Sequence, residues 1–256
     1  MNLLIDCGNS SVKLAFSNGS IVEEVYSIDH SSDSSFQSNL KLKVSQLKKH
    51  FSIKEIFIVS VNKEIEPILK EALIKVFNKV PIKFLKKRKF KSFKTSYKNP
   101  AMFGLDRFFN CIGGNLIYPK SNLIIVDMGT ATTFDVIDKK LSHIGGIILP
   151  GALTAHYSLL SNTSMIKTRE IVLTNKLLGS STSECLSSGF VNGQVHMIRG
   201  IVQEIQQTSK LKFKVLVTGG ISNIFLEAFK DYEYHSSLVL NGIVNYIKKS
   251  NKNDRI

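Results

Sequence analysis

Short apolar runs alternate with stretches of helical apolar spacing along the first half of the chain. Strands are predicted at 3–5, 12–16, 21–25, 56–59 and 82–85. Apolar residues three or four positions apart predict helices at 40–51 and 65–76, and the serine-rich segment 29–38 is predicted to be a loop. Ser17-Asn18-Gly19-Ser20 is a favourable hairpin turn, so the first three strands are expected to form a meander. This alternation predicts an α/β domain with a mixed sheet.

The second half of the chain repeats the alternation. A helix is predicted to begin near Gly104 and to run to Gly113-Gly114. Strands are then predicted at 123–126, 133–137, 143–149 and 215–217, and helices at 152–160, 181–207, 224–229 and 238–248. Gly189 and Gly193 predict an interruption of the longest of these helices. The segment 163–177 has no clear periodicity.

Length and composition indicate an ordinary globular protein. With 256 residues, the chain is expected to form two domains, 1–113 and 114–256, with a terminal helix that can pack back across the boundary. No run approaches the roughly 18 apolar residues of a membrane span, and the start of the chain lacks the basic region of a signal peptide. The three cysteines are widely spaced, which argues against a disulfide framework or a zinc site and predicts a cytoplasmic protein.

The chain carries a formal net charge of +14, from 34 Lys and Arg against 20 Asp and Glu. Such an excess is compatible with nucleic-acid binding, with an anionic substrate, or with a lysine-rich composition that has no function. We favour the last because the lysines are spread along the chain. The segment 86–98 is the exception, since Phe90, Phe93 and Tyr97 are interleaved with basic residues. It is interpreted as a solvated loop anchored by its rings, as a rim that attracts anionic substrates, or as a patch for single-stranded nucleic acid.

Two stretches share an arrangement that suits phosphate binding. In each, an apolar strand ends in an aspartate, then one further residue, then a glycine and small polar residues. The first stretch is Asp6-Cys7-Gly8-Asn9-Ser10-Ser11-Val12-Lys13, and the second is Asp127-Met128-Gly129-Thr130-Ala131-Thr132. A glycine lets backbone N–H groups approach a phosphate, and an aspartate can hold Mg²⁺ through water. One such turn is weak evidence, but the repetition predicts an internal duplication with Asn9-Ser10-Ser11 aligned on Thr130-Ala131-Thr132.

A third motif, Gly104-Leu105-Asp106-Arg107, lies where a helix is predicted to begin. A carboxylate beside a guanidinium at a helix start is commonly a cap or an ion pair. In a phosphotransferase, Asp106 could instead accept the proton of an attacking hydroxyl, and Arg107 could bind a substrate carboxylate with its planar guanidinium.

These motifs together resemble type III pantothenate kinase, in the superfamily of actin, hexokinase and Hsp70. The resemblance implies two ribonuclease-H-like domains that face across a central cleft, ATP and Mg²⁺ as cofactors, K⁺ or NH₄⁺ near Asp127, and a homodimer. It implies ATP binding by Asp6, Cys7, Gly8, Asn9, Ser10, Ser11, Val12, Lys13 and Thr130. It implies pantothenate binding by Tyr97, Gly104, Leu105, Asp106, Arg107 and Thr182, with Asp106 as the catalytic base and Thr182 reaching across the dimer interface.

Further segments match the family or depart from it. The run from Gly145 to Gly151 fits the pattern Gly-Gly-x-Ile-x-Pro-Gly, and its glycines could also serve packing alone. Thr218-Gly219-Gly220 is expected to line the nucleoside, although the acidic residue that relatives often carry next is absent. Three of the six histidines, His143, His156 and His196, have no metal-ligand spacing and are expected to be structural.

The predicted reaction is the phosphorylation of pantothenate by ATP, the entry step to coenzyme A. Two alternatives remain from the sequence. One is a different chemistry on the same fold, such as another small-alcohol kinase or a polyphosphate hydrolase. The other is a transcriptional regulator that binds nucleic acid through its basic surface, which steeply salt-dependent DNA binding without kinase activity would favour.

Overall fold

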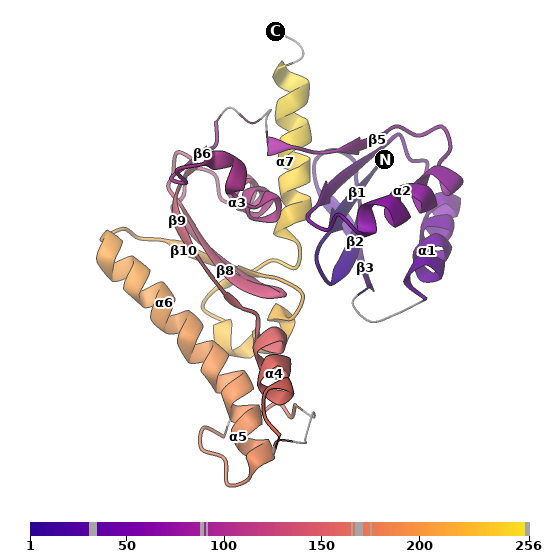
Figure 1. Ribbon diagram of the computed structural model, residues 1–256. Helices are drawn as coiled ribbons and strands as arrows, with labels where there is room; N and C mark the ends of the chain where they lie inside the picture. The colour runs from indigo at the N-terminus through magenta and orange to yellow at the C-terminus, as the bar shows by residue number, and fades with distance from the viewer. Residues whose placement is uncertain are drawn as a thin grey trace. The chain divides into compact units, whose positions relative to one another are not determined.

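The computed structural model describes residues 1–30, 35–87, 90, 92–164, 166, 171–174 and 176–253, with only the backbone for 251–253. The chain forms two compact units (Figure 1). The first unit comprises Met1–Lys120, Lys140–His143 and Ser237–Ile256, and the second comprises Ser121–Lys139 and Ile144–Ser236. The terminal helix therefore belongs to the first unit, as the sequence allowed, while the domain limits at residue 113 stay a prediction.

The first unit is built on a five-stranded sheet of order β3-β2-β1-β4-β5. Its strands are β1 (Asn2–Cys7), β2 (Ser11–Ser17), β3 (Val22–Asp29), β4 (Glu55–Ser60) and β5 (Ile82–Phe84). The predicted meander is confirmed, since β1 pairs antiparallel with β2, and β2 with β3. β4 pairs in parallel with both β1 and β5, which makes the sheet mixed.

Helices cover this sheet. They are α1 (Phe36–His50), α2 (Ile65–Val76), α3 (Leu105–Ile117) and α7 (Leu238–Asn253), with a short 3-10 turn η2 (Pro100–Met102) before α3. Side chains of α1 and α2, including Leu40 and Leu69, share one buried core with Ile5 and Leu14 of the sheet. Burial of these apolar stripes stabilises the helices, because isolated helices of this length are marginal in water.

The second unit is built on a sheet of order β11-β10-β7-β8-β9-β6. Its strands are β7 (Leu123–Met128), β8 (Ala131–Ile137), β9 (Ser142–Pro150), β10 (Lys214–Thr218) and β11 (Glu233–Tyr234). β6 (Lys94–Thr95) pairs in parallel with Ser142 and His143, the residues of β9 that belong to the first unit. β7 pairs antiparallel with β8 and parallel with β10, and β10 pairs in parallel with β11.

The helices of the second unit follow β9. They are α4 (Ala152–Ser161), α5 (Thr182–Ser188) and α6 (Gln194–Ser209), with a π-helical segment η3 (Gly189–Gly193) between the last two. This confirms the predicted interruption of the long helix at its two glycines. After β10, the predicted helix at 224–229 is a pair of short 3-10 turns, η4 (Ser222–Phe225) and η5 (Glu227–Phe229).

The two sheets have the same strand topology. If β6, which belongs to the first unit, is left aside and the strands β1–β5 and β7–β11 are each numbered from their own beginning, both sheets run in the order 3-2-1-4-5. In both, the first strand pairs antiparallel with the second and parallel with the fourth. The internal duplication predicted from two short motifs therefore extends to the fold, and the α/β class with mixed sheets flanked by helices is confirmed.

Two boundaries differ from the sequence prediction. The segment predicted as a loop at 29–38 contains the end of β3 and the start of α1, and its residues 31–34 lie outside the described part of the chain. The helix predicted to end at Gly113-Gly114 continues to Ile117, because both glycines are buried in the contact between α3 and α7. A Cβ on Gly113 would lie 2.1 Å from the backbone oxygen of Leu238 in α7, so glycine permits the close approach.

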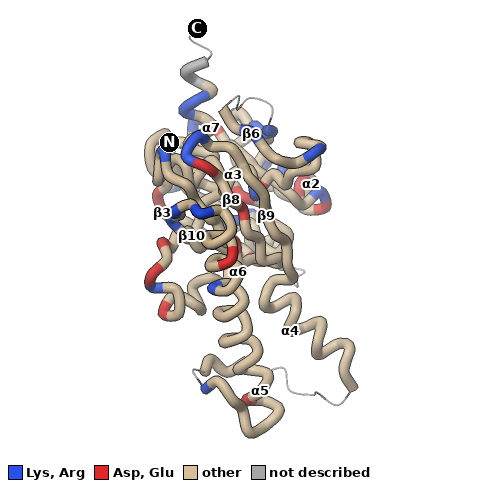
Figure 2. Tube along the Cα trace, turned by 90° about the vertical axis from the view of Figure 1, so that its left-hand side faces the viewer, with Lys and Arg blue, Asp and Glu red and all other residues tan. Residues whose placement is uncertain are grey.

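The positive charge is not spread evenly, contrary to the sequence interpretation. The first unit holds 25 of the 34 basic residues and 11 of the 20 acidic residues, whereas the second holds nine of each. Figure 2 shows few charged positions on α4 and α6. The excess of +14 therefore belongs to the first unit alone.

Among the described residues, no helix is long and apolar enough to cross a membrane.

Candidate functional site

The first predicted phosphate-binding turn joins β1 to β2. Asp6 and Lys13 are opposite each other in the register of the two strands, so their side chains leave the same face of the sheet. The N–H of Gly8 donates to the Ser11 oxygen at 3.0 Å and closes the turn. Burial raises the pKa of the Cys7 thiol to about 11. The turn therefore has a fixed backbone, with one carboxylate and one ammonium beside it.

His30, which follows β3, contacts two backbone oxygens of this turn. Its backbone N–H donates to the Ser10 oxygen at 3.0 Å, and its Nε2 lies 3.1 Å from the Gly8 oxygen. In a trans peptide the C=O and the following N–H point in opposite directions. Anchoring these two carbonyls therefore turns the N–H groups of Asn9 and Ser11 away from His30.

The second turn joins β7 to β8 in the second unit. The N–H of Gly129 donates to the Ala131 oxygen at 3.1 Å. The oxygen of Thr130 accepts from the Gly151 N–H at 3.0 Å and from Thr154 Oγ1 at 2.7 Å. By the same peptide geometry, the N–H of Ala131 points away from α4. Asp127, at the end of β7, stands beside this turn as Asp6 stands beside the first.

The two turns differ in length by one residue. Each glycine N–H closes its turn on the first residue of the next strand, which is Ser11 in the first turn and Ala131 in the second. Ser11 therefore corresponds to Ala131, and the alignment of Asn9-Ser10-Ser11 on Thr130-Ala131-Thr132 was wrong after the glycine. The first turn has two residues between glycine and strand where the second has only Thr130.

Two further glycines allow backbone segments to approach the second turn. A Cβ on Gly151 would lie 2.1 Å from the Gly129 oxygen and 2.6 Å from the Thr130 oxygen. Gly219 has φ +107°, and a Cβ there would lie 2.4 Å from backbone atoms of Met128. The packing role considered for the Gly145–Gly151 run is confirmed at Gly151. The Thr218-Gly219-Gly220 tip lies next to the strand that ends at Asp127.

The two aspartates fit the cations that the family resemblance implies. Mg²⁺ is commonly bound by one or two carboxylates completed by water and substrate phosphates, and Asp6 could supply one such carboxylate beside the first turn. Asp127 is opposite Thr133 and Thr218 in the register of the neighbouring strands, and carboxylate and hydroxyl oxygens are groups that K⁺ or NH₄⁺ could contact. Among the described residues, no three His, Cys, Asp or Glu side chains gather as metal ligands.

The Gly104-Leu105-Asp106-Arg107 motif lies at the start of α3, as predicted. Gly104 is the residue before the helix, and Asp106 Oδ1 accepts the N–H of Arg107 at 2.8 Å. A Cβ on Gly104 would lie 2.7 Å from the same Oδ1, so glycine leaves room for the carboxylate. The helix N-terminus also favours the negative charge of Asp106.

Arg107 lies between aromatic rings. Its side chain is 5% exposed, and its NH1 group donates to the Tyr97 hydroxyl at 2.7 Å. The guanidinium carbon lies 5.1 Å from the ring centre of Phe103 and 5.7 Å from that of Tyr97. The first unit therefore brings together three site residues that were predicted from the sequence: Tyr97, Asp106 and Arg107.

Lys87 also contributes to this region, and sequence reasoning missed it. Its Nζ donates to the oxygens of Ala101 at 3.0 Å, Pro100 at 3.2 Å and Phe103. Burial lowers the pKa of Lys87, and the Asp106 carboxylate acts in the opposite direction. Lys87 thus holds the η2 turn that leads into α3. Nothing in the basic run around it distinguishes Lys87 from its neighbours.

The aromatic residues of the basic segment 86–98 anchor it to the unit. Phe90 is 5% exposed and stacks on Tyr246, with ring centres 6.2 Å apart. Phe93 contacts Phe108 at 5.0 Å. These contacts agree with the interpretation of a loop held by its rings. Residues 88, 89 and 91 of this segment lie outside the described part of the chain.

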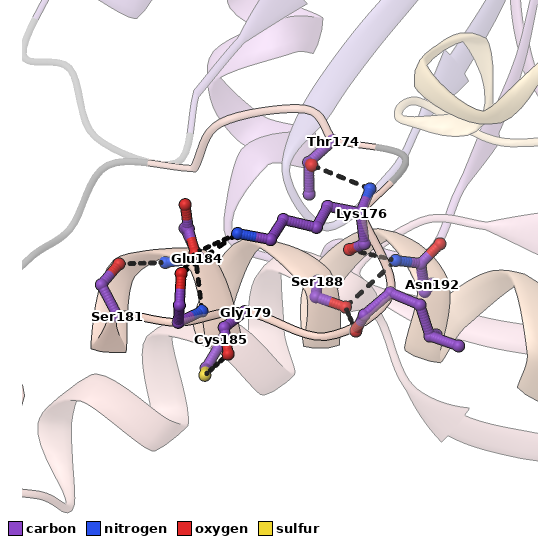
Figure 3. A network of polar contacts seen from close by, with 10 residues as sticks. Thr174, Lys176, Gly179, Ser181, Glu184, Cys185, Ser188 and Asn192 are labelled. Atoms are coloured by element: carbon purple, nitrogen blue, oxygen red, sulfur yellow. Dashed lines mark hydrogen bonds and ion pairs between the residues drawn. The ribbon is translucent and has the colours of Figure 1, made fainter.

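Thr182 is the first residue of α5 in the second unit. Ser181 caps the helix by accepting the N–H of Glu184 at 3.2 Å, as the sequence suggested. The Glu184 carboxylate accepts from Lys176 Nζ at 2.8 Å and from the Ser180 N–H at 2.6 Å (Figure 3). These hydrogen bonds lower the pKa of Glu184 to about 2, with that from Lys176 the largest cause. The network fixes the loop that presents Thr182.

Among the described residues, two hollows of the second unit bear on the site. One, of about 370 Å³, is lined by α4 and α5 and includes Thr182 and Cys185. The other, of about 550 Å³, lies at α6 and β10 and contains no predicted site residue. Two basic residues, Arg199 and Lys214, line it, and Arg199 is paired with Asp231 at 2.6 Å. None of the residues predicted to carry the chemistry therefore lines the larger hollow.

Comparison with known proteins identifies the family. A family model described as type III pantothenate kinase matches residues 2–204. The type III pantothenate kinase of Persephonella marina is 32% identical over 250 residues, covering 95% of this chain and 96% of that protein. That of Legionella pneumophila strain Corby is 31% identical over 249 residues, with the same coverage of 95% and 96%.

Solved structures share the fold. A protein described as a Baf family transcriptional activator from Campylobacter jejuni aligns with a TM-score of 0.60 at 23% identity, covering 98% of this chain and 99% of that one. Component A of the (R)-2-hydroxyglutaryl-CoA dehydratase of Acidaminococcus fermentans aligns with a TM-score of 0.51 at 11% identity, covering 97% and 98%. Identities this low establish the fold alone. The family model and the two relatives above 30% identity establish the family. This chain belongs to the type III pantothenate kinase family.

Proposed function

We propose that this protein transfers the γ-phosphoryl group of ATP to pantothenate, producing ADP and 4′-phosphopantothenate, the first step of coenzyme A biosynthesis. The observation that carries the proposal is the match of the family model over residues 2–204, which contains both phosphate-binding turns, the Gly104–Arg107 motif and Thr182. A regulator that binds nucleic acid is not favoured, because the curated relatives with high coverage are named kinases.

Asp106 is the proposed general base. The hydroxyl oxygen of pantothenate attacks the γ-phosphorus, the bond from that phosphorus to the bridging oxygen of ADP breaks, and the hydroxyl proton passes to the Asp106 carboxylate. The position at the start of α3 supports this role, since the Gly104 backbone leaves the carboxylate room and the helix end favours its charge. Phosphoryl transfer depends mainly on such positioning and on neutralised charge.

The acceptor is proposed to bind next to this base. Arg107 takes the pantothenate carboxylate in a planar, charge-assisted pair. Tyr97, Gly104 and Leu105 complete the contact in the first unit. Thr182 reaches the acceptor from a second copy of the chain. Its place at a capped helix start supports a fixed hydroxyl donor.

The turns at Asp6–Lys13 and at Thr130 are proposed to bind the phosphates of ATP. Backbone N–H groups and the Lys13 ammonium neutralise phosphate oxygens, and Asp6 holds Mg²⁺ through water. Mg²⁺ supplies charge neutralisation at the phosphates when it is bound. Asp127 is proposed to hold K⁺ or NH₄⁺.

A homodimer formed through α4 and the segment before α5 is part of the proposal. Tyr157 and Leu159 of α4 are 56% and 45% exposed, and Leu177 and Leu178 before α5 are 61% and 81% exposed. Large exposed apolar side chains on neighbouring elements are typical of interaction surfaces. The cytoplasm is proposed as the compartment, in keeping with the widely spaced cysteines.

An ADP-release assay on the purified protein tests the function. We expect release that requires pantothenate and that is faster in potassium than in sodium buffer. Other small alcohols offered in place of pantothenate separate this proposal from a different kinase on the same fold. Release that is independent of pantothenate would refute the proposed acceptor.

A further inference from the structure

Arg107 depends on Tyr97 for its orientation. The guanidinium is almost fully buried, at 5% exposure, and donates one of its N–H groups to the Tyr97 hydroxyl at 2.7 Å. The ring of Phe103 lies on one side of it, at 5.1 Å from the guanidinium carbon. A bidentate pair with a carboxylate requires the plane of the guanidinium to be set in advance. The position of Tyr97 therefore decides how well Arg107 can receive a carboxylate.

Tyr97 is in turn held by Thr95. The N–H of Tyr97 donates to Thr95 Oγ1 at 3.2 Å, which ties the backbone at Tyr97 to the side chain of β6. The Tyr97 ring meets Phe103 edge-on, with ring centres 5.2 Å apart. The hydroxyl of Thr95 is thus the link between β6 and the residue that contacts Arg107.

His143 completes the chain of contacts from β9. Its Nδ1 lies 3.0 Å from Thr95 Oγ1, and its backbone oxygen accepts the N–H of Ser96 at 3.0 Å. The imidazole is 2% exposed and packs 4.5 Å from the ring centre of Phe103. All of these residues belong to the first unit.

The shortness of β6 makes this side-chain contact important. β6 consists of Lys94 and Thr95 only, and its register pairs Thr95 with His143. So short a strand has few ladder hydrogen bonds to fix its position, and the Thr95–His143 hydrogen bond adds to the ring contacts that anchor the segment before it.

We propose that Thr95 and His143 are positioning residues that, through Tyr97, orient Arg107 and thereby set the preference of the enzyme for an acceptor that carries a carboxylate. The inference rests on the proposed function, because it assumes that Arg107 receives the carboxylate of pantothenate. It predicts a loss of selectivity between acceptors rather than a general loss of activity.

The test compares pantothenate with pantothenol, in which a CH₂OH group replaces the carboxylate and the reacting hydroxyl is unchanged. Thr95→Val keeps the shape of the side chain and removes its hydrogen bonds, and Thr95→Ser restores the hydroxyl. We expect Thr95→Val to lower the ratio of kcat/KM for pantothenate to kcat/KM for pantothenol by about tenfold, the usual worth of one charge-assisted hydrogen bond. The KM for pantothenate should rise, while kcat and the KM for ATP stay within about twofold.

His143→Leu should change the ratio in the same direction, and His143→Asn, which retains a polar group near the Nδ1 position, should restore part of it. Thermal unfolding of every variant shows whether it is folded. If Thr95→Val does not fold, Thr95→Ala gives the comparison, since it removes the same hydroxyl and must also lower the ratio.

An unchanged ratio in folded Thr95→Val, or an equal loss for both acceptors, overturns the inference and leaves the proposed function intact. A wild-type protein that phosphorylates neither acceptor overturns the proposed function, and the inference with it. A Thr95→Ser variant as unselective as Thr95→Val also contradicts the inference, because the hydroxyl would then not be the operative group.

Discussion

A single methyl group at Gly113 should separate the two helices that support the proposed catalytic base. In the contact between α3 and α7, a Cβ on Gly113 would lie 2.1 Å from the oxygen of Leu238 and 2.9 Å from the nitrogen of Gly242. Reciprocally, a Cβ on Gly242 would lie 2.1 Å from the oxygen of Phe109. These neighbours are backbone atoms, which cannot rotate away, so the helices must move apart by about 1 Å to reach an ordinary contact distance.

The cost of Gly113→Ala follows from two opposing terms. Overpacking of a well-packed contact costs about 1–3 kcal/mol, and the rigid neighbours place this site at the upper end. Alanine in a helix interior recovers about 1 kcal/mol relative to glycine. The net loss is therefore about 2 kcal/mol. For a chain of this size, we expect the melting temperature to fall by about 4–8 °C.

Gly200→Ala in α6 is the matched control. The substitution is the same and also lies inside a helix, but nothing lies within 4 Å of the added Cβ. It should raise stability by about 0.5–1 kcal/mol. Thermal unfolding compares the two variants directly. Circular dichroism monitors it, because the chain has no tryptophan whose fluorescence could be used. A Gly113→Ala protein that melts at or above the temperature of Gly200→Ala would refute the reasoning.

Three further predictions concern individual side chains. Asp106→Asn should lower turnover by about 10²–10⁴, the worth of a positioned base, while Glu227→Gln on an exposed turn should have no effect; near-normal turnover in Asp106→Asn removes the residue from its role. Iodoacetamide at pH 8 should modify Cys185, which is exposed, and spare Cys7, which is buried and has its pKa raised to about 11; mass spectrometry decides, and equal labelling contradicts the burial argument. The lowered pKa of Glu184 means that its carboxylate stabilises the fold above about pH 4.5 and that this contribution is lost as the pH falls toward 2. Between pH 5 and pH 3, the melting temperature of the wild-type protein should therefore fall further than that of Glu184→Gln. Equal falls in the two proteins would show that the network of Glu184 contributes nothing to stability.

Much of the fold could be predicted from local patterns. The strands on either side of each phosphate-binding turn are apolar runs bounded by turn residues, and the glycines in the helix at 181–207 marked its π-helical segment. The duplication was visible in two short motifs, and it extends to the topology of both sheets. Local chemistry sufficed because these features depend on residues close together in the chain.

What escaped prediction depends on contacts between distant residues. β6 exists because Thr95 pairs with His143, which is 48 positions away, and no local signal marks a strand of two residues. Lys87 lies in a basic run that gives no sign of its hydrogen bonds to the turn before α3. The alignment of the two turns was wrong by one residue because turn length is set by the backbone hydrogen bond of the glycine, which the residue types do not reveal.

The central claim is that this protein forms 4′-phosphopantothenate. Mass spectrometry and phosphorus NMR of the product, after incubation of the purified protein with ATP, Mg²⁺, K⁺ and pantothenate, test it most directly. The account predicts one phosphoryl group on the 4′ oxygen of pantothenate for every ADP released, with at least about a hundredfold less product from Asp106→Asn over the same time. ADP without a phosphorylated acceptor, or a phosphoryl group at any other position, would contradict it.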